Sequence, residues 1–168
     1  MIETKRLFMV EAKESDIESI MEMENHKENR DFIWQGTYQQ HLEEIKDGNH
    51  LLLRFNKKEN GEMIGYALVG LDLKSEKFEL RRIAVSQKGM GYGKEAMKAL
   101  IKFAFEEKNI NRFWLDVYPD NKVGIRLYEG LGLKRDGVLR ANYKSERGYL
   151  DQIIYSMLKS EYKLSKNR

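Results

Sequence analysis

Three glycines in five positions, Gly89, Gly91 and Gly93, precede the most regular helical pattern of the chain, in VSQKGMGYGKEAMKALIKFAF (85–105). A glycine in regular structure costs about 0.5–1 kcal/mol relative to alanine. These glycines must therefore meet a need that a side chain would prevent, either a positive φ angle or close approach of the backbone to a ligand. Because N–H groups and the helix dipole favour anions at a helix N-terminus, the pattern is typical of a phosphate-binding turn. A tight turn that binds nothing is the alternative.

The glycine spacing excludes the two most familiar phosphate-binding motifs. In the P-loop register set by Gly93-Lys94, Lys88 stands where the first glycine belongs, and Glu95 replaces the hydroxyl residue that holds magnesium. A GxGxxG pattern starting at Gly89 ends on Lys94 instead of glycine. Neither a nucleoside triphosphatase nor a dinucleotide-binding protein is therefore expected.

Composition narrows the class of protein further. The chain has 168 residues, 41% of them hydrophobic, which suits one domain. No apolar run approaches the roughly 20 residues of a membrane span, and the first residues lack a signal-peptide layout, so no membrane partner and a cytoplasmic location are expected. Cysteine is absent, and the three histidines, His26, His41 and His50, have no ligand spacing and are predicted at the surface. No metal site is expected.

The charge of the chain is unevenly distributed. The net charge of +3 is too small to indicate nucleic-acid binding, but residues 1–50 carry −6 and the remainder +9. A solvated acidic helix face explains this asymmetry. A more specific interpretation is an acidic entrance for a cationic substrate, beside a basic site for an anionic cofactor.

The periodicity of apolar residues predicts a mixed α/β sheet. A capping box indicates a helix from Ser15, with Glu18 as partner, and another indicates a helix from Thr37, with Gln40 as partner. Further helices are predicted after the glycines and over 121–132. Strands are predicted at 6–12, 50–55, 63–72, 78–85, 112–118, near 133–143 and at 149–157, with a hairpin turn at Asn60-Gly61.

The resulting order is β-α-α-β-β-β-α-β-α-β-β, in which antiparallel strands come first and one strand-helix-strand crossover follows. This predicts an α/β fold with a single-domain, mostly antiparallel sheet flanked by helices. The domain is expected to span residues 1–160, followed by a polar C-terminal tail over 161–168.

Two motifs at this spacing resemble those of the GNAT superfamily, the acetyl-CoA-dependent N-acetyltransferases. The first is IAV (83–85) followed by KGMGYG (88–93), and the second is NKVGIRLYEGLGL (121–133). The opening ETKRL and the late GVLR and YLDQIIYSML are similar to the ribosomal-protein and polyamine acetyltransferase branch. The chain departs from the family pattern at Lys88, where Gln or Arg is usual, at Gly124, where Ala is usual, and at Leu133, where Phe is common.

The resemblance implies acetyl-CoA as acetyl donor, with its pyrophosphate on the amides of residues 89–94. It implies a set of residues that contact this cofactor: Ile83, Ala84, Val85, Lys88, Gly89, Met90, Gly91, Tyr92, Gly93, Lys94, Asn121 and Tyr128. Lys88 and Lys94 are also explained as ordinary solvated charges, and Asn121 as a plain helix cap.

Acetyl transfer to an amine requires a neutral amine, a donor for the developing oxyanion and a proton for the departing thiolate. The resemblance implies Glu79 as base, an N–H near Ile83 or Val85, where the family strand bulges, as oxyanion donor, and Tyr128 as acid. A solvated strand glutamate is the alternative for Glu79, and a core aromatic the alternative for Tyr128. Without cysteine, direct transfer in a ternary complex is expected.

The acceptor amine stays open at this point: a protein N-terminus, a polyamine and a small amine all fit, and a homodimer is compatible with the resemblance. Trp34 and Tyr38, in the acidic first third, are expected to border the acceptor side. Two rival functions remain, a non-catalytic acyl-CoA-binding regulatory domain and a scaffolding α/β domain that binds no cofactor.

Overall fold

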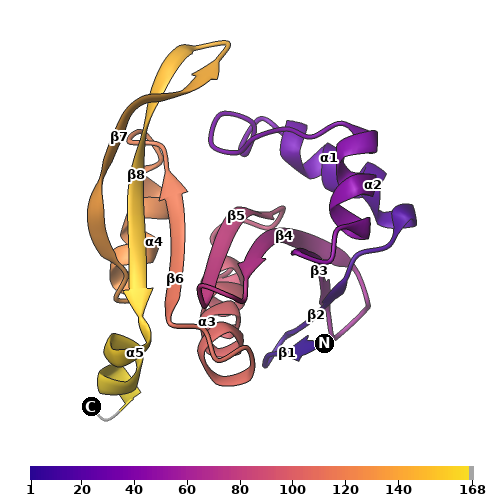
Figure 1. Ribbon diagram of the computed structural model, residues 1–168. Helices are drawn as coiled ribbons and strands as arrows, with labels where there is room; N and C mark the ends of the chain where they lie inside the picture. The colour runs from indigo at the N-terminus through magenta and orange to yellow at the C-terminus, as the bar shows by residue number, and fades with distance from the viewer. Residues whose placement is uncertain (167–168) are drawn as a thin grey trace.

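The structure is a computed structural model that describes residues 1–166. Its frame is an eight-stranded sheet of order β1-β2-β3-β4-β5-β6-β8-β7, in which only β5 and β6 run parallel (Figure 1). The predicted α/β fold with a mostly antiparallel sheet is thus confirmed. The strands are β1 (Ile2–Glu3), β2 (Leu7–Glu11), β3 (His50–Lys57), β4 (Met63–Asp72), β5 (Lys77–Val85), β6 (Arg112–Val117), β7 (Lys134–Ser145) and β8 (Gly148–Leu158).

Helices cover both faces of the sheet. The α-helices are α1 (Ile17–Asn25), α2 (Tyr38–Lys46), α3 (Tyr92–Lys102), α4 (Lys122–Gly130) and α5 (Lys159–Lys166). A 3₁₀ turn, η1 (Glu14–Asp16), precedes α1, and a π-helical turn, η2 (Phe103–Glu107), follows α3. The main core lies under α3 and α4, and a smaller one lies between the sheet and α1 on the opposite face.

The strands β5 and β6 separate after a short stretch of pairing. Only residues 77–79 of β5 pair with residues 112–114 of β6, although both strands continue beyond that point. Figure 1 shows the two strands spreading apart toward their C-terminal ends. Because the hydrogen-bonded ladder is interrupted there, the backbone and side chains of both strands are free to line a cavity between the two halves of the sheet.

Several local predictions can be compared with the structure. The predicted capping box of Thr37 and Gln40 is confirmed at the start of α2. The predicted turn at Asn60-Gly61 is also confirmed, because Gly61 lies in the β3–β4 hairpin with a φ of 75°. The predicted capping box of Ser15 and Glu18 is wrong. Ser15 lies inside the 3₁₀ turn η1, which precedes α1, and the Asp16 side chain accepts a hydrogen bond from the backbone N–H of Lys13. The polar segment after residue 160 is helical up to residue 166, and its last two residues lie outside the described part.

Candidate functional site

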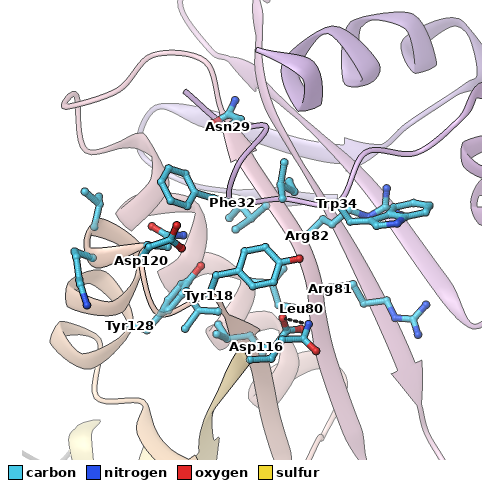
Figure 2. A pocket seen from close by; sticks show the side chains of 18 of the residues that line it. Asn29, Phe32, Trp34, Leu80, Arg81, Arg82, Asp116, Tyr118, Asp120 and Tyr128 are labelled. Carbon is cyan, nitrogen blue, oxygen red and sulfur yellow. Dashed lines mark hydrogen bonds between the residues drawn. The ribbon is translucent and has the colours of Figure 1, made fainter. Parts of the chain in front are cut away.

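A cavity of about 690 Å³ opens where β5 and β6 separate. Its floor is formed by residues 80–83 of β5 and 115–117 of β6, and its walls come from four other segments. These are the loop between α1 and α2, the glycine loop, the start of α4 and the β7–β8 hairpin. Figure 2 shows Phe32 and Trp34 on one side of this cavity and Tyr118, Tyr128 and Asp116 on the other.

The glycine loop lies at one end of the cavity, with Gly89 in its lining. Gly91 is the N-cap of α3 in the left-handed conformation, with a φ of 78°, and no side chain caps the helix there. The first-turn N–H groups of α3 therefore lack a side-chain partner and can receive an anion. Gly93 needs no positive φ, and a Cβ built on it would meet only Val85 Cγ2, at 3.9 Å. Close approach of a ligand is therefore the physical need that remains for glycine at this position.

A cluster of contacts holds the glycine loop against the N-terminal segment. The Arg6 Nε donates to Glu95 Oε2 at 2.6 Å, and its Nη1 donates to the Met90 carbonyl at 2.9 Å. The Arg6 guanidinium also lies 4.2 Å above the ring of Tyr92. Thr4 adds a hydroxyl donor to Glu95 at 2.6 Å. The loop is thus positioned by residues far from it in sequence.

The structure brings part of the predicted cofactor set to the cavity. Ile83, Lys88, Gly89, Asn121 and Tyr128 line it. The other predicted residues lie elsewhere: Ala84, Val85 and Tyr92 are buried in the two cores, Met90 is 59% exposed, and Gly91, Gly93 and Lys94 are outside the lining. Their predicted contact with the cofactor through backbone amides stays a prediction.

Lys88 links the glycine loop to the opposite wall of the cavity. Its Nζ donates to Asn29 Oδ1 at 2.5 Å, and Asn29 in turn donates to the Met23 carbonyl at the end of α1. Burial lowers the pKa of Lys88, against the opposing effect of Glu28. Lys88 is therefore exposed but held by a hydrogen bond, and its contact with the cofactor stays a prediction.

Asn121 and Tyr128 line the cavity together, as their seven-residue spacing on one helix predicts. Asn121 also caps α4 by accepting from the Gly124 N–H at 2.9 Å. A Cβ at Gly124 would lie 2.8 Å from Asn121 Nδ2, which explains glycine at this departure from the family pattern.

Tyr128 is 8% exposed and packs near Tyr155, with ring centroids 6.4 Å apart. Burial raises the pKa of its hydroxyl to about 12, with a further contribution from the negative charge of Asp116. A tyrosine with this pKa keeps its proton at neutral pH. Tyr128 therefore belongs to the core and lines the cavity at once, so that the two interpretations of this residue are compatible.

Asp116 is a cavity residue that sequence reasoning missed. It lies near the end of β6, and its Oδ2 accepts from Gln152 Nε2 of β8 at 2.7 Å. Burial raises the pKa of Asp116 and the charge of Glu79 adds to this rise, although the hydrogen bond from Gln152 opposes it. A carboxylate in the otherwise apolar and aromatic segment FWLDVY (113–118) was the available signal.

Glu79, the predicted base, is not among the residues that line the cavity. It lies one strand away from Asp116, on β5, and accepts from Arg81 Nε at 3.1 Å. Its influence on the pKa of Asp116 shows that the two carboxylates are electrostatic neighbours.

The bulge of β5 lies earlier than predicted. Leu68 pairs with Arg82 whereas Val69 pairs with Leu80, so Arg81 is the extra residue. The bulge thus lies two residues before Ile83, and the oxyanion donor near Ile83 or Val85 stays a prediction. The extra residue changes the alternation of the strand, so that Arg82 faces α1 and α2 while Leu80 faces the main core.

A buried charge cluster lies behind the Trp34 side of the cavity. Glu24, fully buried, accepts from Arg82 Nη1 at 3.0 Å and from the Tyr66 hydroxyl at 2.5 Å. Its Oε2 lies 3.1 Å from Nε2 of His41, which is also fully buried. The guanidinium of Arg82 lies 4.6 Å above the ring of Trp34. The cluster therefore connects α1, α2 and β5 to the wall of the cavity.

His41 contradicts the prediction that all three histidines lie at the surface. Burial alone would lower its pKa, but hydrogen bonds to Glu24 and Glu44 outweigh this effect and raise the pKa to about 9. For Glu24 the signs are opposite: burial alone would raise its pKa. The hydrogen bonds that it accepts, the one from His41 being the strongest, outweigh burial and bring its pKa below the ordinary value. Glu44 also pairs with Arg82. These acidic residues of the first third are thus neutralised in the interior, where they present no acidic entrance.

No helix within residues 1–166 is long and apolar enough to cross a membrane. Within the same range, histidines and carboxylates form no cluster of three or more that could hold a metal ion.

The model of the acetyltransferase (GNAT) family matches residues 12–133. This match covers both motifs, the glycine loop and the start of α4, and the chain therefore belongs to the GNAT family. A solved structure supports the fold: the GNAT-family acetyltransferase from Bacillus anthracis has a TM-score of 0.80 at 18% identity, over 95% of this chain and 99% of that one.

Three curated relatives are similar over parts of the chain. The uncharacterized N-acetyltransferase p20 of Bacillus licheniformis is 35% identical, over 44% of this chain and 42% of its own. The spermine/spermidine N(1)-acetyltransferase of Bacillus subtilis (strain 168) is 32% identical, over 49% and 59%. The ribosomal protein bS18-alanine N-acetyltransferase of Escherichia coli (strain K12) is 30% identical, over 62% and 70%. The chain thus spans about half the length of the first two of these relatives.

Proposed function

We propose that this protein is an N-acetyltransferase that transfers acetyl from acetyl-CoA to a primary amine by direct attack in a ternary complex. The observation that carries the proposal is the cavity between β5 and β6, which joins the glycine loop at one end to Tyr128 and Asp116. The cavity thus places a candidate anion site, an acid and a carboxylate in one continuous space. Acetyl-CoA supplies the acetyl group as a thioester.

The residues around the glycine loop fit the pyrophosphate of coenzyme A. The uncapped first turn of α3 offers N–H donors, and Gly93 leaves the space that a Cβ would fill. Lys88 and Lys122 line the cavity and add positive charge. Charge-assisted hydrogen bonds of this kind are stronger than neutral ones.

Tyr128 is the proposed acid. Its pKa of about 12 keeps the hydroxyl protonated when a thiolate, whose ordinary pKa is about 8.5, departs. Asp116 in the cavity, with Glu79 behind it, is the proposed route for the proton of the amine. As the C–N bond forms and the C–S bond breaks, this carboxylate pair takes the amine proton and Tyr128 gives one to the thiolate, so the products are an amide and a free thiol.

Release of free thiol from acetyl-CoA in the presence of an amine panel tests this proposal. The chain has no cysteine, so a thiol reagent reports coenzyme A alone. We expect amine-dependent thiol release, together with mass gain of the amine by one acetyl group. Thiol release that does not depend on any amine would contradict the proposal.

The two rival functions give different results in the same experiment. A regulatory domain binds acetyl-CoA in calorimetry and consumes none of it. A scaffolding domain shows no heat of binding and no thermal shift. A homodimer stays a prediction, which sedimentation of the full chain would test.

A further inference from the structure

The acceptor end of the cavity is lined by aromatic rings from separate segments. Phe32 and Trp34 come from the loop between α1 and α2, Tyr118 follows β6, and Tyr143 lies on β7 (Figure 2). The rings of Tyr118 and Tyr143 are stacked, with centroids 5.7 Å apart and an interplanar angle of 29°. This end of the cavity therefore offers apolar faces that would contact the body of an acceptor.

Two of the three carboxylates of the lining accept a hydrogen bond from a side chain of the protein. Asp116 accepts from Gln152, and Asp120 accepts from Arg147 Nη1 at 2.6 Å. The third, Glu28, lies half-exposed, and the positive charge of Lys88 near it disfavours a second ammonium group there.

The charge of the lining also disfavours a substrate with several ammonium groups. Four basic residues, Arg81, Arg82, Lys88 and Lys122, line the cavity with only three carboxylates. Two further carboxylates behind the wall, Glu24 and Glu44, are paired with Arg82 and His41. A second ammonium inside the cavity would be desolvated against a lining in which Asp116 and Asp120 are already engaged, which is unfavourable.

The rim of the cavity is crossed by an arginine of the β7–β8 turn. Arg147 donates to Asp120 Oδ2 and to the backbone carbonyl of Asp31, 116 residues away. Asp120 lines the cavity, and Asp31 lies between the lining residues Asn29 and Phe32. Arg147 therefore connects the two walls, and an extended peptide could leave the cavity on this side only if these hydrogen bonds were broken.

We propose, on the basis of the acetyl-transfer function above, that the acceptor is a small primary monoamine whose amine is attached to an aromatic or similarly apolar body. The aromatic lining fits that body, and the half-buried Asp116 near the end of β6 suits one amine. The other two carboxylates of the lining are exposed, and one of them, Asp120, is already paired with Arg147, which disfavours a polyamine. A protein N-terminus would have to displace Arg147.

The test compares three acceptors with the full chain: 2-phenylethylamine, spermidine and a short peptide with an N-terminal alanine. We expect kcat/KM for 2-phenylethylamine to exceed that of each of the others by at least about 10-fold, which is about 1.4 kcal/mol. A higher kcat/KM for spermidine or the peptide would overturn the inference, while acetylation of either would leave the acetyl-transfer function standing.

A pair of variants tests the carboxylate argument directly. Tyr143→Glu adds an acidic side chain to the cavity lining, and Tyr149→Glu adds one on the same hairpin at a position 69% exposed and outside the lining. We expect Tyr143→Glu to raise kcat/KM for spermidine relative to 2-phenylethylamine by about 10-fold or more, and Tyr149→Glu to leave the ratio unchanged. An equal ratio in the two variants, with both folded by circular dichroism, would refute the argument.

Binding without turnover separates the two proposals. Calorimetry in the presence of coenzyme A measures the affinity of 2-phenylethylamine and spermidine whether or not acetyl is transferred. Preferential binding of 2-phenylethylamine without acetylation supports the inferred ligand chemistry and contradicts acetyl transfer. Binding of neither amine, or tighter binding of spermidine, overturns the inferred chemistry.

Discussion

The buried histidine of α2 should make the stability of the protein fall as the pH rises. His41 has no exposed surface and lies between Glu24 and Glu44, with ring nitrogens 3.1 Å and 2.9 Å from their carboxylate oxygens. Its pKa in the folded protein is about 9, against 6.5 for an ordinary histidine. The folded state therefore binds the proton more tightly than the unfolded state does.

The size and direction of the effect follow from these two pKa values. At about 1.4 kcal/mol for each pKa unit, the protonated histidine contributes up to about 3 kcal/mol to the free energy of unfolding. This contribution is complete below pH 6.5 and is lost as the pH rises through about 9. The value is an upper limit, because the Tyr66 hydroxyl and the Arg82 guanidinium continue to stabilise the Glu24 carboxylate when His41 loses its proton.

Urea unfolding of His41→Gln and of the original chain at several pH values between 6 and 9.5 or so measures the effect. We expect the difference in unfolding free energy between the two proteins to shrink by about 2–3 kcal/mol across this range. His26→Gln, which alters a half-exposed histidine at the end of α1, is the matched control. A difference between the two proteins that is constant with pH would refute the assignment of a protonated histidine in this cluster.

Four further predictions concern the cavity and its supports. Tyr128→Phe should lower kcat by about 10²-fold or more with little change in acetyl-CoA affinity or melting temperature, and normal turnover would identify Tyr128 as a core residue only. Asp116→Asn should lower kcat/KM by about 10²–10⁴-fold near neutral pH, with a defect that shrinks at high pH, and Glu79→Gln should have the smaller effect; the reverse order in pH-rate profiles would place the base at Glu79. Gly93→Ala should raise stability by about 0.5–1 kcal/mol and weaken acetyl-CoA binding at least about 10-fold, and unchanged affinity in calorimetry would exclude a phosphate site there. Gly36→Ala should destabilise the protein, because its Cβ would lie 2.6 Å from His41 Nε2, and a melting temperature equal to that of the original chain would show that the cluster tolerates the displacement.

The sequence by itself determined the features that depend on short-range periodicity and turn chemistry. The runs of apolar residues bounded by turn signals located every long strand, and Thr37 and Asn60-Gly61 were found from local capping and turn preferences. The joint position of Asn121 and Tyr128 also followed from the helical repeat. Each of these features depends on residues close together in the chain, so a single sequence contains the necessary information.

Only the tertiary structure decided which side chains meet at the site. Asp116 enters the cavity because β5 and β6 separate after residue 79, and Tyr118 reaches Tyr143 because β8 pairs with both β6 and β7. The bulge at Arg81 turned Arg82 to the opposite face from Leu80, where it meets Glu24. Strand order and a one-residue bulge reverse or join whole faces of a sheet, and the alternation within one strand does not specify them. For the same reason the spacing of histidines predicted a surface position for His41, whereas the packing of α2 against α1 and β3 buried it with two carboxylates.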